Sequence, residues 1–374
     1  MRYKNIEGLK FNPSLLGMGC MRFPTLSDGS IDKAQVKEMF KYALSHGVNY
    51  IDTAWPYHGG KSELVVGEMI KDYDRESFYL ATKLPTFSYD MLKNAKEIFN
   101  KQLEKLGVDY IDFYLVHALN KTRFEQVKEL NILPMLEELK KEGKIRHIGF
   151  SFHDNYETFE EIINYYDWEF CQLQINYMDD DKQARIKGIE LATEKGLFII
   201  VMEPLKGGAL VNLSDEVKDV FRKSEESSED SLIKWAFRYA ASYDAVKIIL
   251  SGMSSLDQVK DNIKIFEDLK DLSEKDKEIV KEAKAKILSL TNNNCTSCKY
   301  CMPCPAGVNI PSAFSAWNRY KMYGNNQTIK RDYFEEHSKD LPSLCVKCGK
   351  CETLCPQHIE IRKDLEKVLL DFGD

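Results

Sequence analysis

The cysteines carry the clearest chemical signal in this sequence, because eight of the ten lie beyond residue 290 in two tight runs. The first run is Cys295-x2-Cys298-x2-Cys301-x2-Cys304-Pro305, and the second is Cys345-x2-Cys348-x2-Cys351-x3-Cys355-Pro356. Four closely spaced thiolates that end in Cys-Pro are typical of iron-sulfur ligands. The spacing therefore predicts two 4Fe-4S clusters.

Three thiolates two residues apart can hold three corners of one cuboidal cluster, whereas a fourth that precedes proline turns away toward a second cluster. We therefore predict crossed ligation. One cluster is held by Cys295, Cys298, Cys301 and Cys355, and the other by Cys345, Cys348, Cys351 and Cys304. The second run has the full spacing of bacterial ferredoxins, but the first has two residues rather than three before its last cysteine. Two four-cysteine zinc sites are the alternative.

A second group of residues suits proton transfer to a carbonyl oxygen. Asp52, Lys83 and His117 each close an apolar run, and Tyr57 follows Asp52 in the loop. The ammonium of Lys83 is expected to lower the pKa of the Tyr57 phenol, which is about 10 when unperturbed. Asp52 would hold Lys83 charged, and His117 would hydrogen-bond the substrate oxygen.

These residues need a frame, and the sequence between residues 30 and about 265 supplies one by alternating β-type runs with helical segments. The predicted strands are 15–20, 48–52, 78–83, 111–117, 145–151, 170–176, 198–203 and 246–251. The predicted helices are 32–45, 62–71, 89–106, 132–141, 155–166, 181–195, 231–241 and 255–269. Eight such units predict an α/β fold, a (β/α)8 TIM barrel with its chemistry at the strand ends. A Rossmann fold is disfavoured because no Gly-x-Gly-x-x-Gly turn is present.

The remaining segments set the predicted domain organisation. The polar stretch 212–230 is interpreted as a mobile loop over the barrel mouth, and the charged helix 274–288 as a connector. We expect a barrel domain with its connector at 1–290 and a small α-helical ferredoxin-like domain at 291–374.

The net charge of -7 and the pI near 5.7 argue against nucleic acid or an anionic membrane as partner. No apolar run is long enough to span a bilayer, and the start lacks the apolar core of a signal peptide. The expected location is the cytoplasm.

The sequence resembles the aldo-keto reductase family over about residues 1–270. The motifs that carry the resemblance are Tyr50-Ile-Asp-Thr-Ala-Trp-Pro-Tyr57, Gly67-Glu68, Thr82-Lys83 and Leu115-Val-His117. With its tail, it is similar to the branch that carries a C-terminal ferredoxin-like domain. The resemblance implies a (β/α)8 barrel that binds an extended NADP or NAD, with Asp52, Tyr57, Lys83 and His117 as the catalytic tetrad and Tyr57 as general acid.

The same resemblance implies the cofactor contacts. Ser151 and Gln172 match positions that hold the nicotinamide carboxamide, and Asn262 matches the adenine contact. The loop over the pyrophosphate is matched by Leu205, Gly207 and Gly208. Ser254 and Gln258 stand where a basic residue often clamps the 2'-phosphate, so the choice between NADPH and NADH stays open.

The expected function is reduction of a small-molecule carbonyl, or oxidation of an alcohol. Hydride carries two electrons and a cluster carries one, so coupling the two needs an intermediate carrier. The clusters would exchange electrons with a protein partner through a flavin or radical step, brace the tail, or sense redox state. A non-enzymatic redox-sensing module is the competing class.

Overall fold

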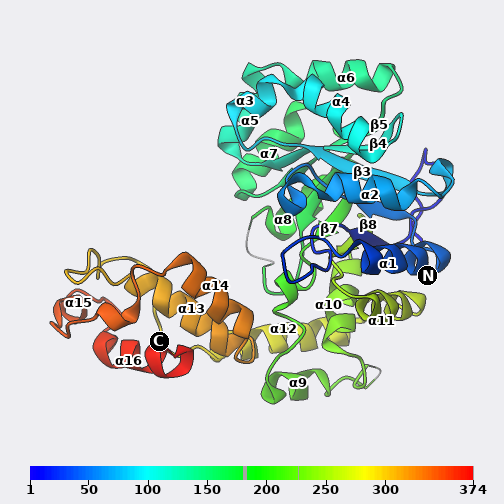
Figure 1. The fold of residues 1–374 in the computed structure, drawn as a ribbon. Helices are drawn as coiled ribbons and strands as arrows, with labels where there is room; N and C mark the ends of the chain where they lie inside the picture. Colours follow the sequence, from blue (N-terminus) through cyan, green and yellow to red (C-terminus); the bar gives the residue numbers. More distant parts are fainter. Residues whose placement is uncertain (180–182, 226, 374) are drawn as a thin grey trace. The chain divides into compact units, whose positions relative to one another are not determined.

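The computed structural model describes residues 1–179, 183–225 and 227–373, and its strands close into a parallel barrel in sequence order (Figure 1). Each strand pairs with its neighbour in the chain, and the last pairs with the first. The strands are β1 (Leu16–Gly19), β2 (Tyr50–Asp52), β3 (Tyr79–Leu84), β4 (Ile111–Leu119), β5 (Ile145–Phe152), β6 (Phe170–Gln174), β7 (Phe198–Met202) and β8 (Val246–Ser251). The predicted (β/α)8 barrel is confirmed, and the strand predictions differ from the structure only at their ends.

Ten helices of the described chain accompany these strands. They are α1 (Lys33–Ser45), α2 (Ser62–Ile70), α3 (Tyr89–Lys93), α4 (Ala95–Leu106), α5 (Lys121–Glu129), α6 (Ile132–Lys141), α7 (Tyr156–Tyr165), α8 (Arg185–Glu194), α10 (Leu232–Ala241) and α11 (Leu256–Glu267). The prediction missed α5, and the first two positions of the helix predicted at 181–195 lie outside the described residues. The helix predicted at 89–106 is two helices, because Asn94 leaves the helical conformation at φ -102° and ψ 24°.

Local signals begin and end these helices. The Asp32 carboxylate accepts a hydrogen bond of 3.0 Å from the Gln35 backbone and so caps α1. Gly107 ends α4 in the left-handed conformation at φ 65°, where a side chain would be strained. Helix ends of this kind fix where each following strand enters the barrel.

Aromatic rings fill the barrel interior around Phe113. Its ring centroid lies 5.4 Å from that of Tyr50, 5.5 Å from that of Tyr79 and 5.3 Å from that of Phe170. Phe11, from the segment before β1, stacks on Tyr79 at 4.3 Å. Because the interior is packed solid, the strands offer chemistry only at their ends.

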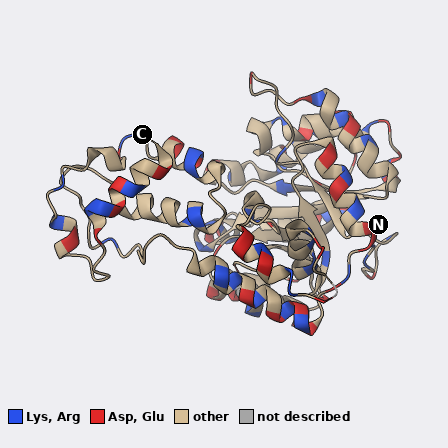
Figure 2. Ribbon diagram, turned by 90° about the horizontal axis from the view of Figure 1, so that it is seen from below, with Lys and Arg blue, Asp and Glu red and all other residues tan. Residues whose placement is uncertain are grey.

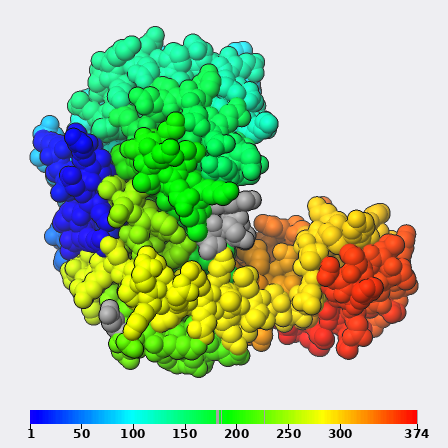
Figure 3. All heavy atoms as spheres, turned by 180° about the vertical axis from the view of Figure 1, so that it is seen from behind, coloured from blue at the N-terminus to red at the C-terminus, as the bar shows by residue number. Residues whose placement is uncertain are grey.

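A second compact unit comprises residues 205–233 and 273–374. Its described elements are η3 (Lys206–Gly208), α9 (Asp215–Phe221), α12 (Glu274–Ser289), α13 (Ile310–Met322), α14 (Gln327–Glu336), η4 (Pro342–Leu344), α15 (Lys350–Thr353) and α16 (Ile361–Phe372). Space-filling atoms of α12, yellow in Figure 3, lie at the molecular surface.

The prediction of a mobile loop over 212–230 is wrong for the part that forms α9. Val217, Val220 and Phe221 recur at helical spacing and are buried. The Ser224 hydroxyl donates to the buried Asp276 carboxylate at 2.7 Å, which ties this segment to α12. The polar composition of the segment 212–230 therefore did not reveal the short apolar face of α9. Residue 226 lies outside the described part.

Acidic and basic positions are intermixed along the helices of both units (Figure 2). Within the described residues, no helix is long and apolar enough to cross a membrane.

Phe113→Ala should lower the free energy of unfolding by about 3–5 kcal/mol, because it opens a cavity where several rings meet. Urea denaturation followed by circular dichroism measures the loss. The matched control is Leu64→Ala, which truncates a side chain that is 47% exposed and should change stability by less than about 0.5 kcal/mol. Equal effects of the two substitutions would contradict this account of the core.

Candidate active site and cysteine cavities

A buried ion pair lies at the centre of the candidate active site. The Lys83 ammonium, at the end of β3, donates to Asp52 Oδ1 at 2.7 Å and to the Thr53 carbonyl oxygen at 2.8 Å. The side chains of Lys83 and Asp52 are only 1% and 3% exposed. The same ammonium lies 3.4 Å from the Tyr57 hydroxyl, so three predicted site residues meet at one nitrogen.

This geometry changes the proton affinity of the groups involved. Burial opposes the charge on Lys83, but Asp52 and Tyr57 together outweigh it and raise the pKa of Lys83 above 10.5. Burial also raises the pKa of Tyr57 above 10, and the attraction of Lys83 offsets this only in part. The expected net lowering of the Tyr57 pKa is therefore wrong, because desolvation of the phenolate exceeds the stabilisation by the ammonium.

His117 completes the group from the end of β4. Its ring centroid lies 6.1 Å from that of Tyr57, edge to face, and 5.1 Å from that of Phe87. Burial and then the charge of Lys83 place the pKa of His117 well below 6.5, so the imidazole is neutral at neutral pH. Its Nδ1 atom is buried and has no hydrogen-bond partner in the described chain. A neutral imidazole at this position can donate a hydrogen bond to a substrate oxygen.

Two of the predicted cofactor residues are adjacent in β5 and β6, where Ser151 pairs in register with Gln172. The Ser151 hydroxyl oxygen accepts from the Ala118 backbone N–H at 2.7 Å. The Gln172 Oε1 atom is buried and has no partner in the part of the chain described. An unpaired buried acceptor suits an amide donor such as the nicotinamide carboxamide, so these residues fit the group that the resemblance implied.

The other predicted cofactor residues belong to other elements. Asn262 is buried in α11, and its amide nitrogen donates to the Ser251 hydroxyl at 2.9 Å. Leu205, Gly207 and Gly208 belong to the second compact unit, where η3 has Gly207 at φ 64° and Gly208 at φ 92°. Their roles toward a cofactor stay predictions.

Sequence reasoning missed one neighbour of the site, Phe87. This residue is 44% exposed although its ring lies against His117, which places an aromatic surface beside the imidazole. Phe87 lies outside the strands, where periodicity gives no contact information. His58, which adjoins Tyr57 in the sequence, packs on Phe23: its Nε2 atom accepts from the Phe23 backbone N–H at 3.1 Å, and the ring centroids lie 5.6 Å apart.

The tail contains two cavities, each lined by four cysteines. The first is lined by Cys295, Cys298, Cys301 and Cys355, and the second by Cys304, Cys345, Cys348 and Cys351. These are the two groups that crossed ligation requires. Within the described residues, no group of three Cys, His, Asp or Glu side chains is arranged to hold a single metal ion.

The two cysteine cavities differ in their surroundings. Burial raises the pKa of Cys295 and Cys301 in the first cavity, and raises the pKa of Cys351 in the second to about 11. Arg362 lines the second cavity and forms an ion pair with Glu352 at 2.8 Å. Thiols with raised pKa must lose protons before they ligate iron, so cluster binding releases protons.

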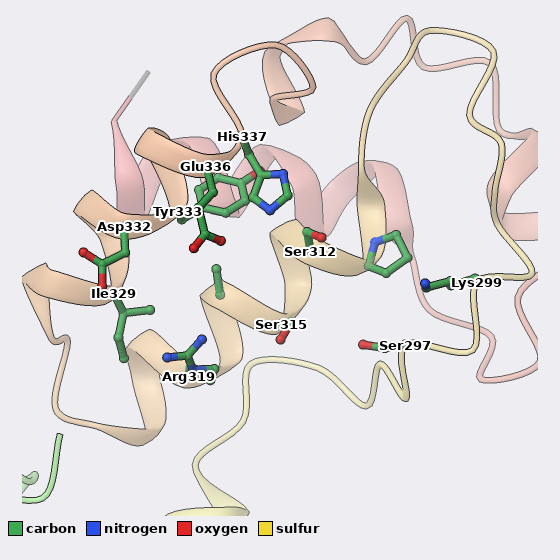
Figure 4. A pocket seen from close by; sticks show the side chains of 12 residues that line it. Ser297, Lys299, Ser312, Ser315, Arg319, Ile329, Asp332, Tyr333, Glu336 and His337 are labelled. Atoms are coloured by element: carbon green, nitrogen blue, oxygen red, sulfur yellow. The ribbon is translucent and has the colours of Figure 1, made fainter. Parts of the chain in front are cut away.

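A polar pocket of about 360 Å³ adjoins the first cysteine cavity, between α13 and α14 (Figure 4). Ser297 and Lys299, which precede and follow Cys298, line both spaces. Arg319 and Asp332 bring opposite charges to the same pocket. The surface beside the first cavity therefore carries both signs of charge.

The fold is a (β/α)8 barrel with Asp52, Tyr57, Lys83 and His117 grouped near its strand ends, and the sequence comparisons give its family, which is one of oxidoreductases. The model of the aldo/keto reductase family matches residues 15–285, and this chain belongs to that family. A model of the 4Fe-4S dicluster domain matches residues 294–360, so the tail is an iron-sulfur domain.

Similar proteins match about three quarters of the chain. The uncharacterized oxidoreductase YqkF of Bacillus subtilis is 27% identical over 289 residues, which are 70% of this chain and 90% of YqkF. L-galactose dehydrogenase of Arabidopsis thaliana is 26% identical over 303 residues, 74% of this chain and 89% of that enzyme. The solved structure of aldo-keto reductase AKR11C1 from Bacillus halodurans in its holo form has the same fold, with a TM-score of 0.62 and 24% identity over 76% of this chain and 96% of its own.

Asp52→Asn should lower the free energy of unfolding by about 3–5 kcal/mol at neutral pH, because it leaves the Lys83 ammonium buried without its counter-charge. The folded-state pKa of Lys83 is raised, so its share of the stabilisation is complete below pH 10.5 and is lost as pH rises through that raised pKa. Burial raises the pKa of Asp52 above 3.8, so the pair is also lost in acid, once Asp52 takes up a proton. Urea denaturation at several pH values measures it. Glu97→Gln breaks the exposed Lys101–Glu97 pair and should leave stability nearly unchanged; an equally small effect of Asp52→Asn would refute the importance of the buried pair.

Proposed function

We propose that the barrel is an NAD(P)(H)-dependent enzyme that interconverts a small-molecule carbonyl and its alcohol, with Tyr57 as general acid. The observation that carries the proposal is the contact of the Tyr57 hydroxyl with Lys83 at 3.4 Å, while Asp52 holds the same ammonium at 2.7 Å. The neutral His117 beside Tyr57 adds a hydrogen-bond donor that carries no charge.

The residues that would hold the cofactor are those implied by the family. Gln172 and Ser151 would bind the nicotinamide carboxamide, and the unpaired buried Oε1 atom of Gln172 supports this role. Leu205, Gly207 and Gly208 would cover the pyrophosphate, and Asn262 would contact adenine. A reduced nicotinamide bound there supplies a hydride to the carbonyl carbon.

The chain itself supplies the proton. The substrate oxygen accepts a hydrogen bond from His117, which fixes its position and polarises the carbonyl. The Tyr57 hydroxyl transfers its proton to that oxygen as negative charge develops there, so the alcohol forms and the tyrosine becomes a phenolate. The Lys83 ammonium stabilises the phenolate, and Asp52 keeps Lys83 charged and in place. Oxidation of the alcohol runs through the same residues in reverse.

In the tail, we propose two 4Fe-4S clusters with crossed ligation. The support is the grouping of four cysteines around each cavity and the dicluster family match. Clusters of this kind move single electrons, and we propose that they serve electron transfer with a protein partner.

Tyr57→Phe should lower kcat about 10²–10⁴-fold, because it removes the proton donor without changing the shape of the site. Nucleotide binding, measured by fluorescence titration, should be unchanged. In the wild type the pKa of Tyr57 is raised above 10, so the rate of carbonyl reduction should stay level toward pH 9 and fall only above that pKa. Alcohol oxidation needs the phenolate, so its rate should rise over the same range.

Steady-state rates with NADH and NADPH over a panel of aldehydes and ketones provide this test. Wild-type turnover in Tyr57→Phe would exclude Tyr57 as the acid. Absence of turnover in the wild type over the whole panel, with nucleotide still bound, would favour a non-enzymatic module.

Cys348→Ala should remove the iron of one cluster, about half of the total, and reduce the visible absorbance of anaerobically purified protein in proportion. The matched control is Cys171→Ala, because Cys171 is buried in β6 and lines neither cysteine cavity. Iron and acid-labile sulfide analysis measures both. Full iron content in Cys348→Ala, or zinc in place of iron in the wild type, would overturn the cluster assignment.

A further inference from the structure

A buried carboxylate lies behind the catalytic residues and takes no part in the proposed proton transfer. Glu63, in α2, is fully buried. Its Oε1 atom accepts hydrogen bonds from the Thr82 hydroxyl at 2.7 Å and from the Gln102 amide at 2.6 Å. Its Oε2 atom forms an ion pair with the Lys105 ammonium at 3.3 Å. A charge buried at this depth requires its partners, so the network is fixed in one arrangement.

Lys105 connects this network to the loop that carries Tyr57. The Lys105 ammonium lies 3.5 Å from the centroid of the Trp55 ring and donates to the Gly60 carbonyl oxygen at 3.4 Å. Trp55 precedes Tyr57 by two residues and Gly60 follows it by three. One cation on α4 therefore contacts the loop on both sides of the catalytic tyrosine.

Gln102, one turn earlier on α4, connects the network to the other catalytic strand. Its amide nitrogen donates to the Lys83 backbone carbonyl oxygen at 3.0 Å, and its oxygen accepts from the Tyr114 hydroxyl at 2.7 Å. Gln102, Tyr114 and Lys83 are all buried. The group that holds the Tyr57 loop is thus bonded to the backbone of Lys83 as well.

The loop needs such support. His58, Gly59 and Gly60 follow Tyr57 with φ of 52°, 62° and 87°, which is a left-handed run that includes one residue with a side chain. The Tyr57 hydroxyl is also at the long end of hydrogen-bonding distance from Lys83, at 3.4 Å. A further displacement of the loop would separate the acid from the cation that stabilises its conjugate base.

We propose that Lys105 is a positioning residue that, through Glu63 and Gln102, holds the Tyr57 loop at a fixed distance from Lys83. Lys105 does not contact the substrate. This role rests on the proposed function of Tyr57. It gives the helix α4, and not only the strand ends, a part in catalysis.

The test compares Lys105→Met with Lys105→Arg. Lys105→Met keeps the length of the side chain but removes the cation, and kcat should fall about 10–100-fold, the scale expected for a small misplacement of a catalytic group. The KM for nucleotide should not change. Lys105→Arg keeps the positive charge over Trp55 and should restore most of the rate.

Two further variants separate positioning from folding. Glu63→Gln combined with Lys105→Met leaves no unpaired buried charge, and it should fold while remaining slow. Lys101→Met lies one turn earlier on the same helix, where Lys101 pairs with the exposed Glu97 and not with this network, and it should keep wild-type kcat. Wild-type kcat in the double variant, or an equal loss in Lys101→Met, would overturn the proposal.

A readout that does not depend on turnover distinguishes this proposal from the proposed function. With 3-fluorotyrosine placed at position 57, fluorine NMR reports the pKa of that phenol directly. The pKa should be higher in Lys105→Met than in the wild type, because the phenolate lies farther from Lys83. An unchanged titration would overturn the positioning role, whereas an inactive wild type with a shifted titration would contradict only the proposed function.

Discussion

The ion pair between Asp52 and Lys83 is the interaction on which the candidate active site depends. Moving an ammonium out of water costs several kcal/mol, and only a counter-charge with good geometry offsets that cost. The barrel provides this geometry because β2 and β3 are adjacent parallel strands, with Asp52 in register with Ala81 and Lys83 two residues further along. A single buried cation then sets the state of its neighbours. It favours ionisation of Tyr57 by stabilising the phenolate, although burial outweighs that effect, and it helps to keep His117 neutral.

A second buried polar group lies beside this pair, around the carboxylate of Glu63. Buried hydrogen bonds from Thr82 and Gln102 surround Glu63 within the space between α2, α4 and β3. Each donor in this group has an acceptor, so the polar atoms add specificity to the packing instead of destabilising it. The aromatic interior around Phe113 supports the site from below without taking part in it.

Much of this arrangement follows from sequence pattern. The eight strands were predictable because a parallel barrel strand is a short apolar run between turn signals, and the tetrad was predictable because Asp52, Lys83 and His117 end such runs. The grouping of Cys355 with the first run was predictable from the proline that follows it. The pattern failed where tertiary contacts decide. The apolar face of α9 lies in a segment that is polar overall, so its composition did not indicate a helix. Asn94 interrupts a stretch with continuous helical periodicity. The direction of the Tyr57 pKa shift depends on burial, which the sequence does not give. The Glu63 network was invisible because periodicity shows which residues are inside and not which polar atoms meet.

The interleaved cysteines of the tail have a consequence for biosynthesis. Cys295, Cys298 and Cys301 leave the ribosome well before Cys355, yet all four line one cavity. Cys304 lines the other cavity together with three cysteines of the second run, which are translated later. With the proposed crossed ligation, neither ligand set is complete until the second cysteine run has been translated, so iron loading of both clusters would follow synthesis of that run.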